Sequence, residues 1–158
     1  LAARCGQAHT LYLLGGSALL MLGSPRLTAD IDYLGDERQL EHLQRVIGDV
    51  AERLHVDVEP VPIHEFVPVS GAARERSIFV GQFGPLAVYA FDPYTIALSK
   101  LDRGFDTDIE DIVFLIERGY VSVERLESLT TDAIAQARDY DLDPAGMRRH
   151  LDAVRRRL

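Results

Sequence analysis

Short apolar runs separated by glycine, serine and proline occupy the first part of the chain, and they predict strands and helices in alternation. Residues 10–14 form a mostly apolar run of five, as expected of a strand buried on both faces. The run stops at Gly15-Gly16-Ser17, where the glycines permit a tight turn and Ser17 is a good N-cap for a short apolar helix over residues 18–22.

The same alternation continues as strand, helix and strand. Residues 28–34 predict a second strand, and residues 36–54 predict a helix, because their apolar positions recur at helical spacing. Residues 56–61 alternate between apolar and polar side chains and predict a third strand. Prolines at positions 60 and 62 place that strand at an edge of the sheet.

The remainder of the chain predicts a hairpin followed by helices. Two strand-like segments, 77–83 and 86–91, are joined by Gly84-Pro85. Asp92-Pro93, an N-cap followed by proline, then starts a series of helices, which we expect over residues 92–101, 108–118, 122–129, 131–140 and 143–158.

These elements indicate an α/β (α+β) fold that has a mixed sheet of about five strands and a helical C-terminal third. We expect residues 1–92 to form the core of the fold. Residues 93–158 would form a helical region packed on that core, so that the chain makes a single compact unit.

The composition is that of an ordinary globular protein, with 47% hydrophobic and 27% charged residues. No apolar run approaches the ~20 residues that span a bilayer, so we expect no membrane contact. A single cysteine, Cys5, fits a reducing, cytoplasmic location. The formal net charge of −8 argues against a surface coated for nucleic-acid binding, although it leaves room for a local basic patch.

Two carboxylates on one strand face can chelate a hard divalent cation such as Mg²⁺ or Mn²⁺, together with substrate phosphate oxygens. Asp30 and Asp32 have this spacing. Gly16 and Ser17 open a helix, where free N–H groups and the helix dipole attract phosphate. Either feature alone is common in turns or on solvated strands. Their joint occurrence, twelve residues apart, predicts a phosphate-and-metal site.

The motif Leu14-Gly15-Gly16-Ser17, followed by Asp30-Ile31-Asp32-Tyr33, resembles the signature of the DNA polymerase beta-like nucleotidyltransferase superfamily. Within it, Arg26-Leu27-Thr28-Ala29-Asp30-Ile31-Asp32 is similar to the form found in AbiEii-like nucleotidyltransferases of bacterial toxin–antitoxin and abortive-infection systems. Leu98-Ser99-Lys100-Leu101 and Asp108-Ile109-Glu110-Asp111-Ile112 resemble helical motifs of that group.

The resemblance implies a role for each matched residue. Gly15, Gly16 and Ser17 would hold the nucleotide phosphates, and Asp30 and Asp32 would bind the catalytic metals. Lys100 would contact the triphosphate, with assistance from Arg26. Asp57 is the candidate for a third metal ligand that also helps to deprotonate the attacking hydroxyl, and Glu59, on the same strand face, is the alternative.

Three of the residues in the helical motifs also have simpler explanations. Lys100 follows apolar residues on its helix and could reach the surface with its stem buried. Asp108 and Asp111 fall in the first turn of a predicted helix, where acidic residues oppose the helix dipole favourably. We expect Asp108 to serve as a cap, whereas Asp111 could face Lys100 or Arg103 and belong to the site.

The implied activity moves an NMP from an NTP to a hydroxyl acceptor. The toxin-type resemblance points to tRNA or protein as the acceptor and to a cognate antitoxin as a partner. A small-molecule (antibiotic) adenylyltransferase would use the same chemistry on a cationic acceptor, which suits the acidic chain. A non-catalytic member of the fold would only bind nucleotide or a partner, and the intact carboxylates argue against it.

Overall fold

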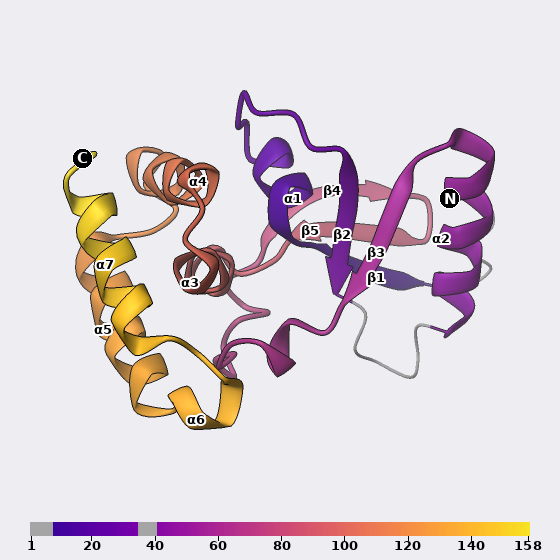
Figure 1. Cartoon of the computed structure of the whole chain (residues 1–158). Coiled ribbons are helices and arrows are strands. Elements are labelled where there is room, and N and C mark those ends of the chain that lie inside the picture. Colours follow the sequence, from indigo (N-terminus) through magenta and orange to yellow (C-terminus); the bar gives the residue numbers. More distant parts are fainter. Residues whose placement is uncertain (1–7, 35–40) are drawn as a thin grey trace. The chain divides into compact units, whose positions relative to one another are not determined.

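The computed structural model describes residues 8–34 and 41–158, and the chain divides into two compact units (Figure 1). The described residues up to Pro62, together with Arg74–Phe91, form what we call the sheet unit. Ile63–Ala73 and Asp92–Leu158 form the helical unit. Cys5 and the predicted start of a helix at residue 36 lie outside the described residues.

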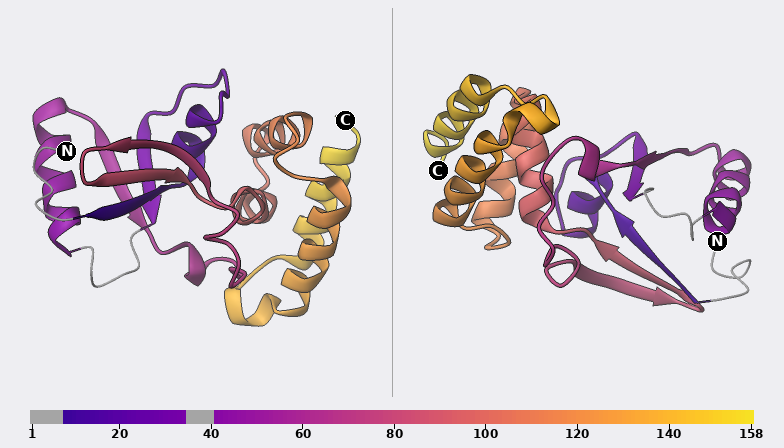
Figure 2. Two further views of the ribbon diagram at one scale, coloured as in Figure 1. Left: turned by 180° about the vertical axis from the view of Figure 1, so that it is seen from behind. Right: turned by 90° about the horizontal axis from the view of Figure 1, so that it is seen from below.

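A mixed β-sheet in the order β3-β2-β1-β5-β4 forms the centre of the sheet unit (Figure 2). β1 pairs antiparallel with β2 and parallel with β5, β2 pairs parallel with β3, and β4 and β5 form an antiparallel hairpin. This confirms the predicted α/β fold, with β3 at an edge. The strands are β1 (His9–Leu13), β2 (Asp30–Leu34), β3 (Asp57–Val61), β4 (Ile78–Phe83) and β5 (Leu86–Ala90).

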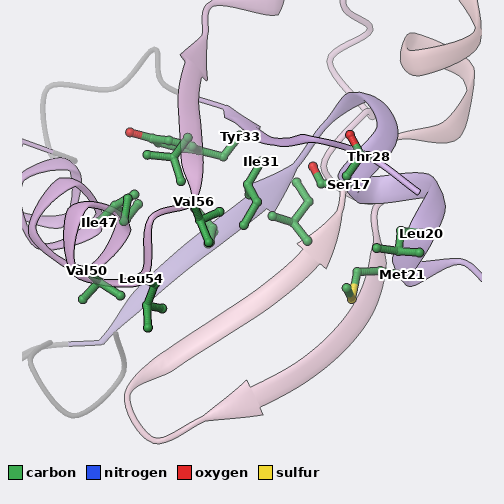
Figure 3. Close-up of a pocket in the computed structure, with 14 residues that line it drawn as sticks. Ser17, Leu20, Met21, Thr28, Ile31, Tyr33, Ile47, Val50, Leu54 and Val56 are labelled. Carbon is green, nitrogen blue, oxygen red and sulfur yellow. The ribbon is translucent and has the colours of Figure 1, made fainter. Parts of the chain in front are cut away.

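Helices α1 (Gly15–Met21) and α2 (Glu41–Leu54) cover one face of this sheet. Met21 of α1 and Ile47 of α2 line the same cavity of about 330 Å³ as Tyr33 of β2 (Figure 3). Because side chains alternate along a strand, the other face carries Tyr12 of β1 and the carboxylates of β2. The candidate active site therefore lies on the face of the sheet that α1 and α2 leave open.

The helical unit begins with a 3-10 helix, η3 (Ile63–Glu65), and continues after β5 with α-helices around a core of its own. Asp92 caps α3 as predicted, because its carboxylate accepts hydrogen bonds from Tyr94 N–H and from Thr95 Oγ1. The helices are α3 (Pro93–Arg103), α4 (Asp106–Glu117), α5 (Val123–Ala135), α6 (Ala137–Tyr140) and α7 (Pro144–Arg155). Buried apolar residues from four of these helices form the core: Ile96, Leu101, Ile112, Leu115, Leu126, Met147 and Val154.

The predicted break between helices at residue 130 is wrong. α5 runs through this position to Ala135. Thr130 is buried, and its hydroxyl donates to the carbonyl oxygen of Leu126 one turn earlier (2.7 Å). A polar residue that satisfies its hydroxyl on the preceding turn does not have to end a helix. The chain leaves α5 only at Gln136, before α6 begins at Ala137.

Candidate active site

The glycine turn after β1 places a carboxylate beside the start of α1. Gly15 has φ of +51°, a left-handed conformation that favours glycine. A Cβ atom at Gly15 would overlap Oδ2 of Asp32, so this carboxylate occupies space that only a glycine leaves open. The amide N–H of Leu14 donates to the carbonyl oxygen of Asp32 (2.9 Å). Both backbone and side chain thus hold Asp32 against the turn.

Ser17 has a different structural role from the predicted one. α1 begins at Gly15, and its N-cap is Leu14, which makes no side-chain capping bond. Ser17 is buried within the first turn, where its hydroxyl lies 2.8 Å from Leu14 O and 3.1 Å from Asp32 O and donates to these carbonyls. The N-cap prediction was wrong because Gly15 already turns the chain. Ser17 ties α1 to β2, and its predicted contact with phosphate stays a prediction.

The second glycine faces a cluster of polar side chains. Thr28 Oγ1 lies 2.6 Å and Arg26 Nη2 lies 3.8 Å from the place that a Cβ on Gly16 would take. Thr28 also donates its hydroxyl hydrogen to Asp30, whose Oδ1 lies 2.9 Å away. The structure therefore brings Gly16, Arg26, Thr28 and Asp30 together. The sequence had assigned no role to Thr28, although it stands two residues before Asp30 in the quoted motif.

The two carboxylates of β3 lie beside those of β2. In the parallel pairing of these strands, Asp57 is the partner of Asp30 and Glu59 is the partner of Asp32. Paired residues in a ladder project from the same face, so all four carboxylates share the open face. Asp57 and Glu59 are both exposed. The register places both on the face of Asp30 and Asp32 and does not choose between them, and the role of a third metal ligand stays a prediction.

The donor set of β2 suits a hard divalent cation. Asp30 is oriented by the Thr28 hydroxyl, and Asp32 is admitted by the missing side chain of Gly15. Carboxylate oxygens are the protein ligands that Mg²⁺ prefers, in combination with substrate phosphate oxygens. Across residues 8–34 and 41–158, no three His, Cys, Asp or Glu side chains converge as a metal-binding group. These residues therefore fit a cation held by two carboxylates and completed by substrate oxygens.

Lys100 belongs to an ion-pair cluster inside the helical unit. Its Nζ lies 2.6 Å from Asp111 Oδ2 and 3.0 Å from Asp108 Oδ1, and its side chain is only 3% exposed. Arg103 Nη2 lies 2.6 Å from the same Asp108 oxygen. The cluster thus joins α3 to α4 and confirms that Asp111 faces Lys100. It also shows that Lys100 does not extend to the surface.

We had expected Asp108 to serve as a simple helix cap. In the structure it is part of this cluster instead. It is 1% exposed, and its second oxygen, Oδ2, is buried without a hydrogen-bond partner among the described residues. Burial on its own would raise the pKa of Asp108, but the hydrogen bond from Arg103 and the charge of Lys100 outweigh it and hold the pKa below its usual value. Asp108 is therefore a buried, ionised residue.

None of the helices in the described part of the chain has both the length and the apolar character that crossing a bilayer requires.

A family model described as "nucleotidyltransferase of unknown function (DUF6036)" matches residues 4–147. Searches of curated proteins and of solved structures give no match. Because the family model covers most of the sequence, the chain belongs to this nucleotidyltransferase family.

Proposed function

We propose that this member of a nucleotidyltransferase family transfers an NMP from an NTP to a hydroxyl group of an acceptor, in a reaction that depends on Mg²⁺ or Mn²⁺. The observation that supports this most strongly is the position of Asp32 against Gly15. A glycine turn that could receive phosphates and a carboxylate that could hold a cation lie in contact there. Asp30, oriented by Thr28, completes the pair of carboxylates.

The proposed roles follow the placement of the side chains. Asp30 and Asp32 would hold the divalent cation, which when bound supplies positive charge to the phosphates. Gly15 and Gly16 let the backbone approach the phosphates, and the first N–H groups of α1, which have no acceptor within the helix, face negative charge favourably. Arg26, whose guanidinium lies beside Gly16, adds a positive charge at the same place.

The reaction forms one bond and breaks another at the α-phosphorus of the NTP. The acceptor oxygen bonds to this phosphorus, the bond from the phosphorus to the bridging oxygen breaks, and pyrophosphate leaves with the electron pair. The proton of the acceptor hydroxyl passes to a carboxylate of β3, either Asp57 or Glu59. Both lie on the open face, in register with the carboxylates of β2.

Arg26 is better supported than Lys100 as a cation for the phosphates. Arg26 lies beside the glycine turn, whereas the ammonium of Lys100 is already paired with Asp108 and Asp111. A contact of Lys100 with the triphosphate would require at least one of these buried ion pairs to open. We therefore propose that Lys100 mainly holds α3 to α4, and its contact with the triphosphate stays a prediction.

We also propose a cytoplasmic toxin that acts on tRNA or protein, because the segment from Arg26 to Asp32 resembles the toxin-type motif. A small-molecule acceptor of positive charge is the alternative, favoured by the net charge of −8. Expression in bacterial cells distinguishes these two proposals. Growth arrest that a co-expressed neighbouring gene relieves supports the toxin, whereas antibiotic resistance without growth arrest supports the alternative.

The transfer reaction is tested by incubating the purified chain with each α-labelled NTP, Mg²⁺ or Mn²⁺, and either total tRNA or total cell protein. We expect label in the acceptor with the wild type and a loss of about 100-fold or more with Asp32→Asn, because a preorganised charge on the phosphates is removed. Glu52→Gln, an exposed carboxylate of α2, is the matched control and should retain full transfer. Equal transfer by Asp32→Asn and the wild type, or no transfer to any acceptor, would contradict the proposal.

A further inference from the structure

An aromatic row crosses the open face of the sheet beside the carboxylates. Tyr12 of β1 pairs with Tyr89 of β5, and Phe79 of β4 pairs with Tyr89 on its other side. The ring centroids of Tyr12 and Tyr89 lie 5.6 Å apart, and those of Tyr89 and Phe79 lie 5.3 Å apart. We call Tyr12, Tyr89 and Phe79 the aromatic row.

The aromatic row is accessible and has a cation at one end. Phe79 is 56% exposed, and both tyrosines are partly exposed. Within the sheet unit, α1 and α2 pack on the opposite face, and on the open face Phe91 and Arg74 contact the ring of Tyr12. The guanidinium carbon of Arg74, an exposed residue, lies 5.7 Å from the centroid of the Tyr12 ring.

Strand register fixes where the aromatic row lies relative to the candidate active site. The pairing of Leu13 with Tyr33 puts Leu14 beside Asp32. Tyr12 of β1 is two residues before Leu14, and the glycine turn comes directly after Leu14. Along the direction of β1, Tyr12 therefore comes before the position beside Asp32, and the glycine turn comes after it.

In-line displacement at phosphorus requires the attacking oxygen and the leaving oxygen to lie on opposite sides of the reacting phosphorus. If the glycine turn receives the leaving pyrophosphate, the acceptor approaches from the side of the aromatic row. Aromatic faces stack on nucleobases with little regard to sequence, and an arginine beside them suits the phosphate of a nucleic-acid strand. A cationic acceptor would instead meet the charge of Arg74.

We propose that the aromatic row is an acceptor subsite that stacks an unpaired nucleobase, so that the acceptor is the single-stranded end of a nucleic acid. The inference rests on the proposed function for the direction of attack, and it adds the residues and the ligand chemistry of the acceptor side. Phe79 is the most exposed residue of the row, so we expect it to stack on the base.

Binding of RNA, measured without NTP and without divalent cation, tests the subsite separately from the chemistry. The probe is a fluorescein-labelled single-stranded hexaribonucleotide, and fluorescence anisotropy at low salt gives its affinity. We expect Phe79→Ala to weaken binding by about tenfold, as for the loss of one stacked base, and Phe79→Tyr to retain it. Because Phe79 is exposed, these variants should fold like the wild type.

Phe83→Ala is the matched control for Phe79→Ala. Phe83 lies on the same strand and is 53% exposed. A shift of register between Phe79 and Gly81 pairs Phe83 with Leu86, so Phe83 projects from the opposite face of the sheet. The control should bind the hexaribonucleotide like the wild type, and a blunt RNA duplex should bind more weakly than the single strand. No binding by the wild type, equal binding by Phe79→Ala, or equal losses in Phe79→Ala and Phe83→Ala would overturn the proposal.

A transfer assay with the same variants separates this inference from the proposed function. If binding depends on Phe79 but the wild type transfers no nucleotide, the stacking site stands and nucleotidyl transfer fails. If the wild type labels protein, and Phe79→Ala does so equally well, nucleotidyl transfer stands and the nucleic-acid subsite fails.

Discussion

At Gly15 two structural requirements coincide. The backbone has a positive φ, and the carboxylate of Asp32 occupies the position of the absent Cβ. Gly23 has the first property without the second, because its φ is +92° and nothing lies within 4 Å of a Cβ added there. A substitution at Gly23 therefore tests the effect of backbone strain alone, whereas a substitution at Gly15 also displaces the carboxylate of Asp32.

We expect Gly15→Ala to reduce nucleotidyl transfer by about 100-fold, since small displacements of reacting groups cost about this much. It should also lower the free energy of unfolding by at least about 1 kcal/mol, because alanine is strained at this φ. Gly23→Ala should show a similar loss of stability but retain transfer. Thermal unfolding and the labelled-NTP assay measure both effects, and equal transfer by the two variants would contradict a positioning role for Gly15.

At the scale of helices, the link between α3 and α4 depends on the only lysine in the chain. Lys100 is surrounded by two carboxylates that are as deeply buried as it is. Removing one partner of a buried ion pair leaves a charge without compensation, which costs more than the pair contributes. An ammonium is also a compact point charge, whereas a guanidinium is planar and larger, so arginine is not an equivalent replacement here.

We predict that Lys100→Met lowers the free energy of unfolding by about 3–5 kcal/mol, as measured by urea denaturation. Adding Asp108→Asn and Asp111→Asn to that variant should restore part of the loss, because no unpaired charge then remains buried. Arg149→Met removes an exposed pair with Asp143 and should cost less than about 1 kcal/mol. If Lys100→Met were as stable as the wild type and had lost only NTP binding, Lys100 would be a nucleotide ligand.

The elements of the fold were largely predictable, because alternation and helical spacing are local signals. Residues 28–34 and 56–61 alternate, and the structure places strands there. The role of Ser17 was not predictable, because the N-cap preference of serine does not reveal that α1 already begins at Gly15. The aromatic row was missed because it joins β1, β4 and β5, and only strand register brings these segments together.

Across the whole molecule, the net charge of −8 contrasts with the local positive charges of the sheet unit. A polyanionic acceptor would be repelled by the chain as a whole. Arg26 lies beside Gly16, and Arg74 lies over the ring of Tyr12. In the sequence, Tyr12 precedes and Gly16 follows Leu14, the residue that is bonded to Asp32. With local positive charge at these two places, an acidic protein could bind the NTP beside Arg26 and a nucleic-acid end beside Arg74.

The free energy of unfolding of the whole chain should decrease in acid, and the direction of this change follows from the lowered pKa of Asp108. Its pKa in the folded chain is below the unfolded value of about 3.9, so the unfolded chain binds the proton more readily. The stability that Asp108 contributes is complete above the unfolded pKa and is lost as the pH falls through the folded pKa. Burial raises the pKa of Asp102, which acts in the opposite direction.

We predict that the urea midpoint decreases steeply below about pH 4. Arg103→Gln removes the hydrogen bond that lowers the pKa of Asp108, and it should therefore lower the midpoint at neutral pH and flatten the decrease in acid. Arg149→Met leaves the cluster intact and removes only one of the smaller influences on the pKa of the exposed Asp143, so its slope should stay closer to that of the wild type than the slope of Arg103→Gln does. A slope in Arg103→Gln as steep as that of the wild type would mean that other carboxylates control acid unfolding.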